Sequence, residues 1–335
     1  MSCPSWTADV PQITTSSSSS SSSDPDNHTM GNGLSEERKE REQRELDRFV
    51  GEISDGPDVK VNQNIVKFCS LDSSDMLRQH YERRMGVSDC APDWIKNLAE
   101  KLGAFMSAPE LAGLGALAVA IFIDIVSFSP PEESMKDALR CVFAEEKASE
   151  VWDQIDECLK RCMMHINDDQ KLSSDLQRIE CQLSAALTKL KNSMLRDGHM
   201  TNEALKAWVN GAAFHIQMLI HLVRLGGTVT CNTVKTLISV YQTELDQLFK
   251  EHEKMTEKKC TVLFKVGEMF QSVFVLVDED AKRHTLNFHN FRRAEFQKLY
   301  YDHRYGQQKR ETENHFNYMR ENLQSLVSQR DSFNF

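Results

Sequence analysis

The sequence predicts an all-α protein: a bundle of long antiparallel helices with one central, wholly apolar helix at about residues 110–128 and a disordered N-terminal tail. Three observations support this prediction. The chain has 335 residues, 40% of them apolar and 27% charged, a composition typical of globular proteins. Gly (14) and Pro (8) are scarce, so few residues would interrupt a helix. Apolar residues recur at spacings of three and four along most of the chain, which is the period of an amphipathic helix.

Composition divides the chain into four parts. Residues 1–34 form a Ser-rich tail with eight consecutive serines at 16–23, too polar to offset its conformational entropy by burial. Residues 35–55 form a charged helix that starts at the N-cap Ser35, and eleven of the fourteen residues 35–48 are charged. Residues 56–90 contain a linker and a short helix at 72–85. The helical-bundle body is expected at residues 91–330.

Besides the apolar helix at about 110–128, the body is expected to contain several long helices. An amphipathic helix is predicted at 91–105, and another runs from Glu132 to about Ile166. The next starts at Asn167–Asp169 and carries a coiled-coil-like seam of apolar residues at 172–190. Two more start at Thr201 and before Val234. The last covers about 290–328, with a kink or break at Gly306.

Residues 260–277 are ambiguous. They contain runs of β-forming residues, Val262 to Phe264 and Val273 to Val277. Two short strands by themselves would have no further strand to pair with. Helix is therefore the preferred interpretation, and strand the alternative.

The apolar stretch at 111–128 is the least usual feature of the sequence. Eighteen residues of helix extend about 27 Å, slightly less than the ~30 Å hydrocarbon core of a bilayer. Asp124 interrupts it, at a cost on membrane insertion of ~2.5–3.5 kcal/mol near the middle of a span. A buried core helix and a membrane-engaging helix therefore stay open as equal alternatives. The candidate residues of this helix are Leu111, Leu114, Leu117, Ile121, Phe122, Asp124, Ile125 and Phe128.

A basic segment with interleaved aromatic residues lies at 282–310. It has eight Lys or Arg against two acidic residues, whereas the whole chain carries a net charge of −10. Such a pattern suits single-stranded nucleic acid or an anionic lipid surface. The favoured interpretation is a helix whose aromatic residues pack inward, because the chain is acidic overall. The candidate residues are Lys282, Arg283, Arg292, Arg293, Lys298, Tyr300, Tyr301 and Arg304.

Three soft side chains share one helix face and are candidate metal ligands. Cys158, Cys162 and His165 are spaced by four and three residues, but zinc would need a fourth ligand from elsewhere. Buried hydrophobic cysteines are the favoured interpretation. The nine cysteines are scattered and odd in number, which favours reduced thiols over a disulfide scaffold.

No phosphate-binding loop, nucleophile elbow or metalloprotease motif occurs. His215 and His221 are interpreted as partly exposed helix residues rather than a proton relay. We therefore expect a non-enzymatic protein without cofactors. No secretory signal is recognised, which predicts a cytoplasmic protein that is not secreted and associates with a membrane if 111–128 engages lipid.

Three functional interpretations follow. The first is a helical-bundle protein that associates with membrane lipid through 111–128. The second is a scaffold or adaptor that binds partner proteins, or itself, through the seam at 172–190 and the charged helix at 35–48. The third is an enzyme whose active site leaves no linear motif, with an unknown small-molecule substrate. The acidic charge argues against nucleic acid as a partner.

Overall fold

The computed structural model describes residues 29–53, 56–85, 112–128, 150–165, 168–227, 229–266, 272–278, 281–287 and 293–329. The chain forms two compact units, residues 1–48 and 49–335. The structure is mostly helical, which confirms the predicted fold class at that level. The helices are α1 (Thr29–Glu52), α2 (Gln63–Phe68), α3 (Ser73–Met85), α5 (Leu114–Phe128), α7 (Glu150–Met164), α8 (Asp169–Arg196), α9 (Asn202–Arg224), α10 (Cys231–Lys259), α11 (Arg293–Glu321) and α12 (Leu323–Ser328).

The starts of three long helices follow from side-chain caps. Asp168, Thr201 and Thr230 accept hydrogen bonds from backbone amides in the first turns of α8, α9 and α10, at 3.0, 3.1 and 3.3 Å. Gly198 and Gly226 follow α8 and α9 with positive φ values of 75° and 71°, the conformation that ends many helices. The predicted boundaries of α8 and α9 are confirmed, whereas for α10 only a start before Val234 was predicted.

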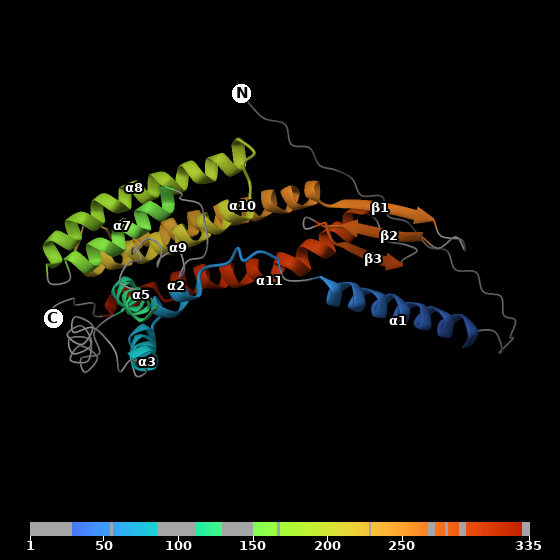
Figure 1. Cartoon of the computed structure of the whole chain (residues 1–335), viewed down its shortest axis with the longest axis horizontal. Coiled ribbons are helices and arrows are strands. Elements are labelled where there is room, and N and C mark those ends of the chain that lie inside the picture. Colours follow the sequence, from blue (N-terminus) through green and yellow to red (C-terminus); the bar gives the residue numbers. More distant parts are fainter. Residues whose placement is uncertain are drawn as a thin grey trace, which may run out of the picture. The chain divides into compact units, whose positions relative to one another are not determined.

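Residues 260–277 do not form a helix, so the preferred interpretation of this segment was wrong. They form the antiparallel strands β1 (Thr261–Val266) and β2 (Ser272–Val277). A third strand, β3 (Arg283–Asn287), pairs with β2, and the sheet order is β1-β2-β3. The physical reason is this third strand: with three strands, the outer two both pair with the middle one. Figure 1 shows the sheet between the end of α10 and the start of α11.

The core of the second unit is built around α9. This helix contacts α2, α5, α7, α8, α10 and α12, and α8, α9 and α10 lie along one another in Figure 1. Every residue from Ala207 to Leu222 is buried. The sequence predicted an amphipathic helix here, with one exposed polar face. In the structure, the polar face of α9 is covered by other helices as well. His215 and His221 are therefore buried, so the prediction that they are partly exposed was wrong.

Other predictions differ in detail or lie outside the described residues. The charged helix α1 begins at Thr29, six positions before the predicted N-cap Ser35. Helix α11 continues through Gly306, where a kink or break was predicted, and ends at Glu321. The tail was predicted at 1–34, but its residues 29–34 belong to helix α1, and residues 1–28 lie outside the described residues. The predicted helix at 91–105 and residues 132–149 of the predicted helix at 132–166 also lie outside the described residues.

Candidate functional site

The apolar helix α5 is enclosed by other helices. Its described side chains from Ala112 to Ile121, together with Ile123 and Asp124, are buried. Helices α2, α3, α7 and α9 all contact it. Among the predicted residues of this helix, Leu114, Leu117, Ile121 and Asp124 are in the core, while Leu111 and the side chains of Phe122, Ile125 and Phe128 lie outside the described residues. Within the described part of the chain, we find no helix long and apolar enough to cross a membrane.

Asp124 has a partner inside the protein. Its Oδ1 lies 2.9 Å from Nε2 of His80 on α3, and both side chains are buried. A buried carboxylate is costly unless it is paired or hydrogen-bonded. The pair therefore compensates the polar group that interrupts α5 and connects α5 to α3.

Helices α2 and α3 belong to a segment, residues 56–85, that covers α5. Its first part is tied to the long helices by polar contacts. The amide of Asn62 donates to Asn210 Oδ1 on α9 (2.6 Å), and the amide of Val59 donates to Gln308 Oε1 on α11 (2.7 Å). Lys60 forms an ion pair with Glu311 at 3.0 Å. These contacts hold the covering segment against α9 and α11.

A cleft of about 630 Å³ lies between this covering segment and α11. One wall consists of residues from 60–72, among them Lys60, Gln63 and Asp72. The other wall consists of α11 residues between 311 and 318. The volume falls in the range of small-molecule sites, roughly 300–1,000 Å³. The backbone amide of Leu71 donates to Tyr318 Oη (3.1 Å), so the two walls are joined at this end as well.

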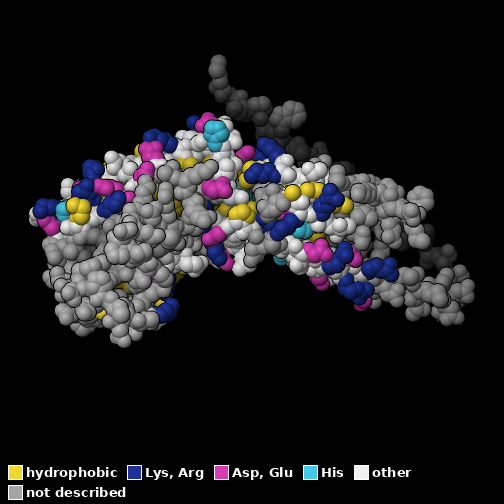
Figure 2. Space-filling view, viewed as in Figure 1, with side chains coloured by type: hydrophobic (Ala, Val, Ile, Leu, Met, Phe, Trp, Pro, Cys, Tyr) yellow, Lys and Arg dark blue, Asp and Glu magenta, His cyan; other side chains and the backbone are white. Residues whose placement is uncertain are grey.

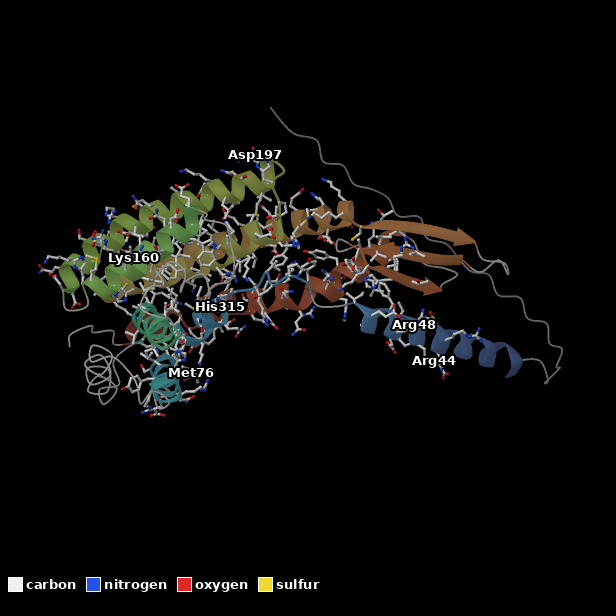
Figure 3. The ribbon with its side chains drawn as sticks, viewed as in Figure 1. Arg44, Arg48, Met76, Lys160, Asp197 and His315 are labelled. Carbon is white, nitrogen blue, oxygen red and sulfur yellow. The ribbon has the colours of Figure 1, made fainter. Side chains whose placement is uncertain are left out.

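His315 on α11 lines this cleft with a buried side chain (Figure 3). Its Nε2 has no hydrogen-bond partner among the described residues. Burial lowers the pKa of His315 to about 4, so the imidazole is neutral at neutral pH. A neutral imidazole offers one N–H donor and one acceptor nitrogen.

Three other buried histidines have hydrogen-bond partners at the interfaces where they lie. His215 Nε2 donates to Glu180 Oε1 (2.9 Å), and its Nδ1 accepts from Tyr241 Oη (2.6 Å), which joins α8, α9 and α10. This hydrogen bond holds the pKa of Glu180 below its usual value, while burial raises the pKa of Tyr241. His252 contacts Tyr301 and Asn202, and His284 contacts Asp278. These groups connect elements of the fold, whereas His315 lines a cleft.

The described aromatic residues of the basic segment lie inside the protein. Tyr300 and Tyr301 are buried. Arg304 is buried too, with its guanidinium 5.7 Å from the Tyr300 ring centre. Lys282, Arg283 and Lys298 are exposed. Arg292 and the side chain of Arg293 lie outside the described residues.

The candidate metal ligands Cys158, Cys162 and His165 do not surround a common metal site. Cys158 and Cys162 are buried. Burial is the main cause that raises the pKa of Cys158, and a hydrogen bond with Cys162 raises it further. His165 Nε2 lies 3.2 Å from Asp175 Oδ2 on α8. In the described segments, no group of three or more His, Cys, Asp or Glu side chains has an arrangement that would hold a metal ion.

Comparisons with family models, with curated proteins and with solved structures find no match to this chain. The residues at the cleft therefore have to be interpreted from their own chemistry. Sequence reasoning did not find this site. His315 lies next to Phe316, on a helix whose apolar face was recognised, but only the fold brings the distant residues 60–72 against it.

Proposed function

We propose that this chain is a non-enzymatic helical adaptor, in which an antiparallel bundle carries a separate charged helix that binds a protein partner. Short connections support the bundle: residues 197–201 join α8 to α9, and residues 225–230 join α9 to α10. Two packed long helices with a short link run in opposite directions. In the same proposal, α5 is a core helix of this bundle rather than a membrane element.

The observation that carries the proposal is that apolar side chains of the second unit are buried in a core, whereas charged side chains of the first unit are exposed. In the body, the apolar seam predicted for partner binding is buried against neighbouring helices: Leu172, Leu176, Ile179 and Leu183 are in its core. Charged residues of both signs are interspersed on the visible described surface in Figure 2. The first unit, by contrast, contains helix α1 up to Arg48, and most of its described side chains are exposed.

Helix α1 has the chemistry of a contact element. Its described side chains at Glu40, Arg41, Arg44 and Asp47 are exposed. Ion pairs along the helix, such as Arg44 with Glu40 at 3.7 Å, are exposed pairs that contribute little to stability. A helix with alternating charge suits salt-dependent pairing with a helix of complementary charge.

Site-specific photo-crosslinking tests the adaptor proposal. A photoreactive amino acid replaces Arg44 on α1 or, as a matched control, the exposed Arg196 at the end of α8. We expect discrete adducts with a protein partner from position 44 but not from position 196. High salt and Arg41→Glu should reduce them. No adducts from position 44, or the same adducts from both positions, would refute the proposal.

The cytoplasm is the compartment that we propose. Cys69, Cys158 and Cys162 are buried free thiols, as is typical of proteins in reducing compartments.

Membrane association through α5 is a second candidate, because the described side chains of this helix other than Asp124 are apolar. If residues 56–85 open, the apolar surface of α5 becomes available to lipid. Leu117→Asn separates the two candidates. A core helix predicts a lower melting temperature and no flotation of the intact chain with anionic vesicles. A membrane element predicts flotation of the intact chain that this substitution reduces.

A further inference from the structure

We propose that the cleft between residues 60–72 and α11 binds a small organic amine, whose ammonium group is held by His315 and Asp72. This site is independent of the charged helix proposed for partner binding. Four observations carry it: a cavity of suitable size, an unpartnered buried nitrogen in its lining, the charge of its walls and the way these walls are held together.

The unpartnered nitrogen is the first requirement for a ligand. His315 is 7% exposed, and its Nε2 has no hydrogen-bond partner among the described residues. Buried polar atoms in folded proteins are nearly always hydrogen-bonded, and exceptions call for an explanation such as an absent ligand. The same side chain is among those that line the cleft of about 630 Å³. A ligand in this cleft is therefore the natural partner of His315.

The charges of the walls indicate the sign of the ligand. Lys60 and Glu311 face each other at 3.0 Å and neutralise one another. Hydrogen bonding to Lys60 lowers the pKa of Glu311, which keeps this carboxylate ionised. Asp72 also lines the cleft and is exposed, with no side-chain partner in the described part of the chain. The one unbalanced charge of the described lining is thus negative.

The hydrogen-bonding groups agree with a donor ligand. An ammonium group carries three N–H donors and no acceptor. Neutral His315 offers an acceptor nitrogen, Asp72 a carboxylate, and Asn314 a side-chain carbonyl in the same lining. An anionic ligand would have to separate Lys60 from Glu311 and would approach Asp72 against charge repulsion. An amine meets neither obstacle.

The walls are fixed before a ligand arrives. The Lys60–Glu311 ion pair and the hydrogen bond from Leu71 to Tyr318 connect both ends of the wall at residues 60–72 to α11. The amide of Gln329 donates to the carbonyl oxygen of Leu71 at 2.7 Å, which holds the same turn from the C-terminal side. A preformed site loses little conformational freedom when the ligand binds.

Calorimetric titration of the full chain with spermidine tests the proposal, with an uncharged polyol of similar length and inorganic phosphate as comparison ligands. We expect saturable binding of one spermidine, and no binding of the polyol or phosphate. Asp72→Asn and His315→Phe should each weaken spermidine binding about tenfold or more. Glu321→Gln is the matched control, because it removes an exposed negative charge from the same helix outside the cleft, and it should leave binding unchanged.

A gain of affinity guards against a variant that merely unfolds. Asn314 is exposed and lines the cleft. Asn314→Asp adds a negative charge there and should tighten spermidine binding, whereas Asn314→Lys should abolish it, with the melting temperature of both variants close to that of the parent. Absence of saturable spermidine binding at millimolar concentration, equal weakening by Glu321→Gln, or binding of phosphate in place of the amine would overturn the proposal.

Discussion

His80 and Asp124 form a buried pair, with Nε2 of the histidine 2.9 Å from Oδ1 of the carboxylate, at the contact between α3 and α5. The pair explains how a helix that is otherwise apolar accommodates a carboxylate in the protein core. It also explains why the covering segment is specific for α5, because the polar group on α5 requires a partner that α3 supplies.

Removal of one partner of this pair should destabilise the protein. We expect Asp124→Ala to lower the free energy of unfolding by about 1–3 kcal/mol, because His80 is left buried without this acceptor. Asp124→Asn keeps an acceptor oxygen and should cost less. The double variant His80→Leu/Asp124→Leu removes both polar groups and should be more stable than Asp124→Ala. Urea unfolding measures all three, and a double variant less stable than Asp124→Ala would contradict the role of the pair.

Gly211 lies where side chains of two other helices pack closely against α9. A Cβ atom added to this α9 residue would lie 2.5 Å from Val151 Cγ1 on α7 and 2.8 Å from Leu187 Cδ2 on α8. We expect Gly211→Ala to destabilise the protein by about 1–3 kcal/mol through overpacking, despite the better helix propensity of Ala. Thermal unfolding provides the measurement.

Two controls make the test of Gly211 specific. A Cβ on Gly51 in α1 meets no atom within 4 Å, so Gly51→Ala should be neutral or slightly stabilising. Val151→Ala creates room beside Gly211 and should reduce the cost of Gly211→Ala in the double variant. Additive costs in the double variant would show that the contact is not the cause.

Arg224 joins the end of α9 to two other parts of the chain. Its Nη1 donates to the carbonyl oxygen of Ala112 (3.1 Å), and its Nε donates to that of Leu326 (2.9 Å). Nη2 also donates to Gln329 Oε1 at 3.1 Å. Lysine cannot reproduce this fork of donors. We therefore expect Arg224→Lys to destabilise the protein almost as much as Arg224→Met, by about 2–3 kcal/mol.

The loss should be visible at particular amides. Hydrogen exchange should become faster in residues 323–329 and at the start of α5 in both Arg224 variants. Arg196→Met, on the exposed end of α8, is the matched control and should leave exchange unchanged. Faster exchange spread evenly over α8 and α10 instead would argue against this role of Arg224.

The sequence predicted where the long helices lie better than it predicted strand pairing and side-chain burial. The starts of α8 and α9 follow from the caps Asp168 and Thr201, and all three long helices α8, α9 and α10 follow from the spacing of their apolar residues. The sheet was missed because its stability depends on β3, a strand whose short, polar sequence has no strong β signal of its own. The burial of His215 was missed because the pattern of α9 does not reveal that α2 and α5 also cover it.

The cleft could not be predicted for the same reason. Lys60 and Glu311 are 251 positions apart in the sequence, and no local pattern indicates that their side chains meet. Asp124, by contrast, was recognised as the residue on which the interpretation of 111–128 depends. Its partner, His80, is 44 positions away, and its sequence context shows only a charged helix.

His252 gives the protein a specific dependence on pH. Each of its ring nitrogens has a partner, Tyr301 Oη at 2.9 Å and Asn202 Oδ1 at 2.7 Å. Burial, with a smaller contribution from the charge of Lys259, lowers its pKa from 6.5 to about 4. Between these two pH values the unfolded chain binds a proton that the folded chain does not. The free energy of unfolding is therefore fully retained above about pH 6.5 and falls as the pH drops towards 4.

The loss from His252 should reach at most about 3 kcal/mol at the acid end of this window. His315, whose pKa burial also lowers to about 4, adds to it in the same direction. We expect His252→Gln to make the free energy of unfolding less dependent on pH between about 6.5 and 4, as measured by urea unfolding at several pH values. The exposed His199 serves as the control, and His199→Gln should leave the slope unchanged. If His252→Gln kept the full slope, the acid sensitivity would have to come from groups other than this buried imidazole.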